Sequence, residues 1–112
     1  MTYNFDINNR AFNAIKNRTK RVEIRCTKIG DNHFNDYIIF ESNGEKIKCL
    51  VEEINHYKTV EELLILEGTR YTLSSTNDFN EGVKSINSLD GYTESIKVNG
   101  VYAIHIKYIN NL

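Results

Sequence analysis

The dipeptide Asn43-Gly44 constrains the fold of this chain more than any other part of its sequence. It separates residues 37–42 from residues 45–57, and both stretches have the pattern of β-strands. Asn and Gly tolerate the positive φ of a type I′ turn, which joins two antiparallel strands through only two residues. The sequence therefore predicts a central hairpin, whose second strand turns these apolar side chains to one face: Ile47, Cys49 and Val51.

Three further stretches have strand patterns, namely residues 2–7, 21–26 and 100–109. Successive side chains of a strand point to opposite faces, so residues 21–26 divide into an apolar and a charged row. The apolar row is Val22, Ile24 and Cys26, and the charged row is Arg21, Glu23 and Arg25.

Capping signals place short helices between the strands. Asn8 or Asn9 is in position to cap a first helix. Thr59 and Glu62 have the spacing of a capping box, and Asp78 and Glu81 have the same spacing. These two pairs predict two more helices. Residues 90–98 are predicted to add a further helical turn.

About five strands and two or three short helices, without a regular βαβ repeat, predict an α+β fold built on a small curved mixed sheet or barrel. Barrel closure also protects the outer strands of so small a sheet. The 112 residues are expected to form a single domain, 1–112.

Several classes of protein are excluded or disfavoured. No apolar run approaches the length of a membrane span, and the N-terminus lacks the layout of a signal peptide, so we expect a cytoplasmic protein. Cys26 and Cys49 form no C-x-x-C motif, and the three histidines are scattered. We therefore expect no metal site and no cofactor.

Charge is distributed unevenly along a chain whose net charge is only -1. Residues 10–28 contain seven basic residues and one acid, whereas residues 36–94 contain twelve acids and five bases. A local basic patch attracts anions. The alternative is that these charges are solvated helix and turn residues.

The charged row of residues 21–26 has two interpretations. It is either a solvated face on which Glu23 neutralises its neighbours, or a pocket wall. In a pocket, arginines bind phosphate and a carboxylate accepts from a base amine or a ribose hydroxyl. Lys20 precedes this row, and the like charges of Arg21 and Arg25 are expected to lower its pKa and favour a nucleophilic or basic amine.

Residues 18–25, R-T-K-R-V-E-I-R, resemble the G-x-K-x-x-E-x-R motif of the ASCH domain, a PUA-like β-barrel family. The order and spacing of the predicted elements are similar over nearly the whole chain, as in the small bacterial single-domain type. The resemblance implies a PUA-like barrel that binds RNA or a nucleotide. Some members are enzymes: one type deacetylates cytidine acetylated on its exocyclic amine, and another is described as a ribonuclease.

On this resemblance Lys20, Glu23 and Arg25 match the motif lysine, acid and arginine. Two positions depart from the pattern. Arg18 replaces the motif glycine, so either Arg18 or Asn17 must end the first helix in a left-handed conformation. Glu23 occupies the position of a threonine in the cytidine deacetylases, and Thr19 is only its neighbour. Their catalytic glutamate would correspond to Glu67.

The leading prediction is a basic cleft that binds RNA or a nucleotide. Its walls would be Lys20, Glu23 and Arg25, with Arg21 or Arg18 on phosphate and Tyr92 as the best of four tyrosines for stacking on a base. The other three are Tyr57, Tyr71 and Tyr102.

Two other classes of function stay open. One is a hydrolase acting on a modified nucleoside such as acylated cytidine, or on RNA. It would use Lys20 as nucleophile or base and Glu23 or Glu67 as proton carrier. The other is a protein-interaction module whose basic strip meets an acidic partner.

Overall fold

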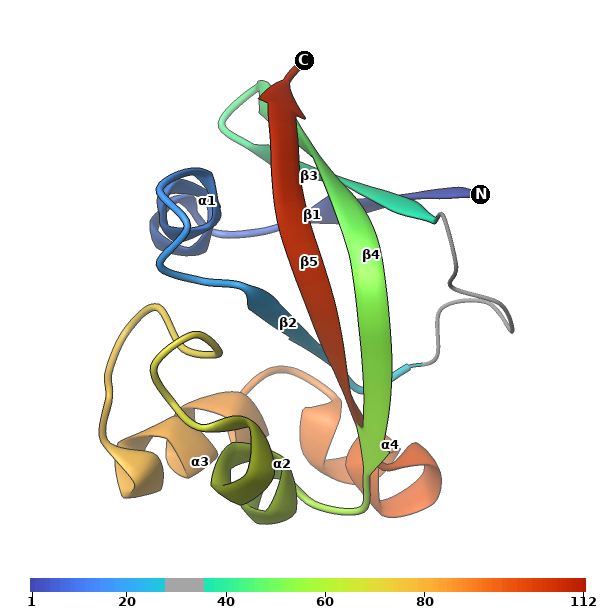
Figure 1. The fold of residues 1–112 in the computed structure, drawn as a ribbon. Coiled ribbons are helices and arrows are strands. Elements are labelled where there is room, and N and C mark those ends of the chain that lie inside the picture. The colour runs from blue at the N-terminus through green and yellow to red at the C-terminus, as the bar shows by residue number, and fades with distance from the viewer. Residues whose placement is uncertain (28–35) are drawn as a thin grey trace.

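The computed structural model describes residues 1–27 and 36–112 (Figure 1). The loop predicted at residues 27–36, which contains Lys28 and His33, falls almost entirely outside them. The elements in chain order are β1 (Thr2–Asp6), α1 (Asn9–Lys16), β2 (Val22–Arg25), β3 (Tyr37–Ser42), β4 (Glu45–Tyr57), α2 (Val60–Glu67), α3 (Phe79–Asn87), α4 (Tyr92–Asn99) and β5 (Val101–Asn111).

The predicted hairpin is confirmed and forms β3 and β4. Ser42 pairs with Glu45 across a two-residue turn in which Asn43 has φ 52° and Gly44 has φ 81°. Both values are positive, as a type I′ turn requires. The turn thereby sets the register of the two strands.

The five described strands form one mixed sheet with the order β1-β3-β4-β5-β2. β1 pairs with β3 in parallel, and the other neighbours are antiparallel. Long, strongly curved β4 and β5 cross the molecule, so the sheet curls into a half-barrel with β1 and β2 as its outer strands (Figure 1). The prediction of a small, mixed α+β barrel is confirmed.

Four short helices occur in the described residues, one more than the upper limit of the prediction. The extra helix is α4, where one further turn was expected and eight residues are helical. The side chains of Asn8, Thr59 and Asp78 cap α1, α2 and α3 as predicted, each accepting from a backbone N–H three residues later.

The helices cover the sheet in two groups. α1 packs its Phe12 and Ile15 against β3, β4 and β5 in one core cluster. α2, α3 and α4 gather at the other end of β4 and β5 and form a second cluster that includes Val22 and Ile24 of β2 (Figure 1). Among the described residues no helix is long and apolar enough to span a membrane.

Candidate functional site

A cavity of about 500 Å³ lies at the open side of the half-barrel, where residues near the two outer strands approach each other. Three parts of the chain line it. The residues are Asp6, Ile7, Asn8, Arg10 and Ala11 around the start of α1; Lys20, Glu23, Ile24 and Arg25 of the motif segment; and Thr72, Leu73, Ser74, Ser75, Ser85, Ile86, Leu89, Asp90 and Tyr92 from the helical end.

The turn at the end of α1 brings Lys20 into this cavity. Arg18 takes the left-handed conformation, with φ 65°, while Asn17 stays at φ -87°. This resolves the alternative that the sequence left open in favour of Arg18. The backbone N–H groups of Thr19 and Lys20 then both donate to the Ala14 carbonyl, at 2.9 and 3.0 Å. The chain reverses there and buries the lysine.

We expect Arg18→Gly to raise the free energy of unfolding by about 0.5–1 kcal/mol, because glycine avoids the steric cost of the left-handed conformation. Urea unfolding at neutral pH measures this. Asn43→Gly is the matched control, since Asn43 also has a positive φ but is a residue type that tolerates it. A gain at Asn43 as large as that at Arg18, or a loss at Arg18, would contradict the strain assigned to Arg18.

Lys20 is held by three acceptors inside the protein. Only 7% of the residue is exposed. Its Nζ donates to the carbonyls of Val22 and Thr72, each at 2.7 Å, and lies 3.6 Å from Glu23 Oε1. This arrangement suits an ammonium group, which has three donors and no acceptor.

The pKa of Lys20 is lowered, as the sequence predicted, but the cause differs from the one expected. Burial is the main cause; the charge of Glu23 opposes it and Arg25 adds only a minor lowering. Arg21, whose exposed side chain packs on Tyr71, is not among the causes of the lowered pKa.

Glu23 binds Arg25 through two hydrogen bonds. Its Oε2 accepts from Arg25 Nε at 3.1 Å and from Nη2 at 2.8 Å, a fork that fixes the guanidinium plane. Its Oε1 accepts from the Ile24 N–H at 3.3 Å. Glu23 is only 7% exposed, so the interpretation of a solvated face is wrong for this residue. With both oxygens engaged, Glu23 positions Arg25.

Arg25 is the charged side chain that this arrangement presents to the cavity. Its guanidinium carbon lies 4.0 Å from the centre of the Phe5 ring, in a cation–π contact between the two outer strands. The side chain is 22% exposed and retains donors that Glu23 does not use. Glu23 and Phe5 thus hold a guanidinium in one orientation at the cavity wall.

Ile24 adds a backbone acceptor beside Arg25. The Ile106 N–H of β5 donates to the carbonyl of Arg21, the residue before β2. In an antiparallel pair every second residue bonds to the neighbouring strand, so Glu23 and Arg25 bond to β5, whereas the backbone groups of Val22 and Ile24 face away from it. The Val22 N–H accordingly turns away from β5 and donates to the Tyr71 carbonyl. The Ile24 carbonyl points to the same open side, and Ile24 lines the cavity.

Tyr92 lines the cavity too, but its setting differs from the predicted loop. It is the first residue of α4, directly after Gly91, and is half-buried. Burial raises the pKa of Tyr92, and the charge of Arg25, together with a hydrogen bond from it, partly offsets that rise. The hydroxyl therefore stays protonated at neutral pH next to the guanidinium.

The cavity is not the basic cleft that the sequence predicted. Among the described residues that line it, three basic side chains accompany three acidic ones: Arg10, Lys20 and Arg25 with Asp6, Glu23 and Asp90. The excess of positive charge lies outside. Arg18 and Arg21 are exposed and do not line the cavity, and neither does Thr19, whose hydroxyl bonds to Asn17.

Glu67 belongs to a separate polar cluster and does not line the cavity. It accepts hydrogen bonds from the Tyr57 hydroxyl and Asn55 amide and contacts His105 Nε2 at 2.7 Å. Burial acts to raise the pKa of Glu67, but these hydrogen bonds and the charge of His105 together lower it. Burial, followed by the hydrogen bond to Glu67 and the charge of Glu67, raises the pKa of Tyr57 to about 12.

Sequence reasoning missed Phe5 and Thr72 as parts of this site. Phe5 belongs to the strand pattern of residues 2–7, which carries no signal of a site, and Thr72 acts through its carbonyl, which any residue type offers. Among the described residues, no three His, Cys, Asp or Glu side chains gather so as to hold a metal ion.

Comparison with protein families gives a match to the ASCH domain over residues 6–110. The chain belongs to the ASCH domain family. This confirms the resemblance noted in its motif and element order. No curated protein matches.

Two solved structures are similar to this chain over nearly its whole length. One is the crystal structure of hypothetical protein PH0355, whose sequence is 31% identical to that of this chain. The match covers 97% of this chain and 100% of that protein, with a TM-score of 0.85. The other is the solution structure of protein PF0455 from Pyrococcus furiosus, whose sequence is 26% identical. The match covers 98% of this chain and 99% of that protein, with a TM-score of 0.75.

Proposed function

We propose that this ASCH domain binds one nucleotide unit, either a free nucleotide or an unpaired nucleotide of RNA, in the cavity next to Arg25. The observation that carries the proposal is the fixed guanidinium. Glu23 holds it by a two-point hydrogen bond and Phe5 packs against it, so its orientation is set before a ligand arrives. Such preorganised donors recognise the planar, hydrogen-bonding edges of bases.

The surroundings of Arg25 support a base as its partner. A volume of about 500 Å³ is in the range of small-molecule sites. The Ile24 carbonyl supplies an acceptor next to the Arg25 donors, and base edges carry both donors and acceptors. Tyr92 offers an aromatic ring and a protonated hydroxyl at the same wall. The balanced charge of the lining suits a base and ribose better than several phosphates.

We propose binding in preference to hydrolysis. A hydrolase of the acylated-cytidine type would use Lys20 and Glu67, but Glu67 does not line the cavity. The Nζ of Lys20 is engaged with Val22, Thr72 and Glu23, which favours a positioning role over a nucleophilic one.

We expect wild-type protein to bind at least one nucleoside monophosphate and Arg25→Lys to bind it about 10- to 100-fold more weakly, the value of one to two charged hydrogen bonds. Lysine keeps the charge but loses the planar fork and the packing on Phe5. Isothermal titration of the four common monophosphates measures this.

Arg21→Lys is the matched control, because it makes the same change outside the cavity and should leave the affinity for the monophosphate unchanged. Absence of binding to all four nucleotides, or an equal loss in Arg21→Lys, would refute the role proposed for the cavity.

A further inference from the structure

We propose that the outer surface beside the cavity binds the phosphodiester groups that flank the nucleotide in the cavity, so that the ligand is a single-stranded nucleic acid rather than a free nucleotide. This inference rests on the proposed function and extends it. The surface consists of Arg18, Arg21 and Arg70 and is called the arginine strip below.

The three members of the arginine strip are contiguous. Arg21 Nε donates to the Arg18 carbonyl at 3.0 Å. The guanidinium carbons of Arg21 and Arg70 lie 4.3 and 5.1 Å from the centre of the Tyr71 ring. Arg18 packs in the same manner on Tyr108, at 5.4 Å. Tyr71 thus positions Arg21 and Arg70 next to each other, and Arg18 joins them through its carbonyl, with all three residues exposed.

These arginines have no acidic partner in the described parts of the chain. The ion pairs found in residues 1–27 and 36–112 involve other cations: the N-terminus, Lys20, Arg25 and His105. Aromatic rings hold the guanidiniums without neutralising their charge. Exposed charge of one sign, fixed in place, is what an anionic partner requires.

The arginine strip and the cavity wall are opposite sides of the same two segments. The Tyr71 carbonyl accepts from the N–H groups of Arg21 and Val22, at 2.8 and 3.0 Å, and the Thr72 carbonyl accepts from Lys20 Nζ. Lys20 and Thr72 therefore face the cavity while their neighbours Arg21 and Tyr71 form the outside. A strand with one nucleotide in the cavity would place the next phosphates on the strip.

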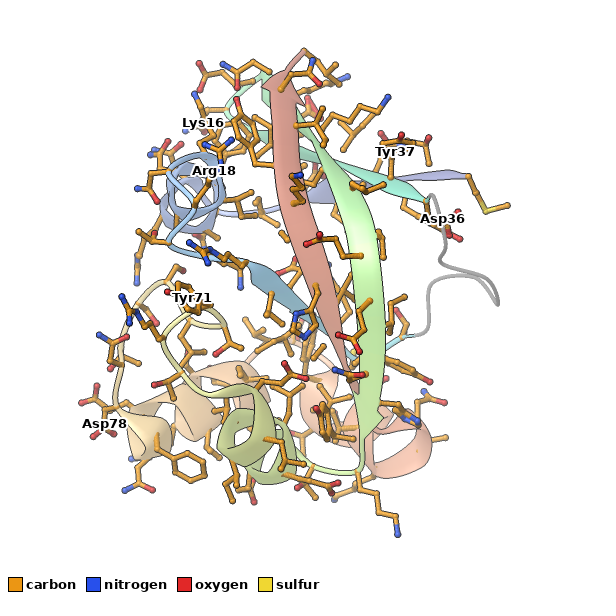
Figure 2. The ribbon with its side chains drawn as sticks, in the orientation of Figure 1. Lys16, Arg18, Asp36, Tyr37, Tyr71 and Asp78 are labelled. Carbon is orange, nitrogen blue, oxygen red and sulfur yellow. The ribbon has the colours of Figure 1, made fainter. Side chains whose placement is uncertain are left out.

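The position of the strip also determines which nucleic acid fits. A base enters the cavity only if it is unpaired, which favours single strands, the usual target of sequence-reading RNA proteins. Figure 2 shows Arg18 and Tyr71 on the same side of the molecule, whereas Tyr37 lies on the opposite side. Lys48 packs on Tyr37 at 4.3 Å, so that pair provides an equivalent cation on a remote surface.

The test compares a short oligouridylate with uridine monophosphate on wild type and on the double variant Arg21→Gln/Arg70→Gln. We expect the oligonucleotide to bind more tightly than the monophosphate. The double variant should weaken oligonucleotide binding at low salt by about tenfold or more and leave monophosphate binding unchanged. Losing two phosphate contacts should also flatten the slope of log K against log salt by about 1.4, at about 0.7 per contact for single strands.

Three results would overturn the inference while leaving the proposed function intact: an oligonucleotide that binds no more tightly than the monophosphate, a double variant that binds it normally, or an equal loss in Lys48→Gln. Equal affinity for polyglutamate of the same charge would do so as well, since it would indicate an acidic protein as partner. Failure of all four monophosphates to bind refutes the cavity proposal, and oligonucleotide binding to the wild type and the double variant still tests the strip.

Discussion

Glu23→Ala should lower the free energy of unfolding by about 3–5 kcal/mol, the usual cost of breaking a buried ion pair by removing one partner. Glu23 lies between Lys20 and Arg25, and its loss leaves two cations without their shared carboxylate. The Ile24 N–H loses its acceptor as well. A loss of this size is a large part of the stability of a small domain, so urea unfolding at pH 7 will show a large shift in midpoint.

Two comparisons separate this effect from a general loss of negative charge. Glu52→Ala removes an exposed carboxylate of β4 and should change stability by no more than about 0.5 kcal/mol. Glu23→Gln keeps the shape and one acceptor oxygen, so its cost should fall between the two. If Glu23→Ala costs no more than Glu52→Ala, then Glu23 does not anchor the site.

The features of the fold that the sequence predicted correctly are those with local causes. A type I′ turn needs only two residues of the right kind, and the caps at Asn8, Thr59 and Asp78 act within three residues. Strand pairing over long separations has no such local signal. The parallel pairing of β1 with β3 was therefore not predicted, and neither was the contact of Phe5 with Arg25 that depends on the curl of the sheet.

The predicted site residues divide for a similar reason. Lys20, Glu23, Arg25 and Tyr92 come together in the cavity, whereas Arg18, Arg21 and Glu67 do not. Strand alternation placed Arg21 in one row with Glu23 and Arg25, but β2 begins only at Val22. The backbone of Arg21 still bonds to β5, but its side chain leaves this row and packs on Tyr71. The roles assigned to these residues stay predictions until the variants are measured.

Burial also changes how the motif lysine is interpreted. From sequence, Lys20 among arginines was a candidate nucleophile with a pKa lowered by like charge. In the folded chain it joins the end of α1 and β2 to the segment around Thr72 through two backbone carbonyls and a carboxylate. If the cavity and the arginine strip bind a ligand as proposed, a group that closes the cavity wall in this way would contribute to binding indirectly, by keeping Arg25 and the strip in place.

Lys20→Met tests this view. We expect it to lower the free energy of unfolding by about 2–4 kcal/mol, because two buried carbonyls lose their donor and each unsatisfied group costs about 1–3 kcal/mol. Methionine fills similar space, so a cavity is not the cause. Glu23 stays hydrogen-bonded to Arg25 in this variant, so the loss of stability does not include the full cost of leaving a buried carboxylate unpaired.

Hydrogen exchange gives the readout that a loss of charge alone would not produce. The N–H groups of Arg21 and Val22 donate to Tyr71, next to the carbonyl that Lys20 holds, so their exchange should accelerate in Lys20→Met more than that of the β3–β4 hairpin. Lys97→Met, at an exposed position of α4, should leave both stability and this exchange pattern near wild type. If the two variants behave alike, Lys20 does not hold the wall, and its buried amine would have to be explained by a role in the cavity itself.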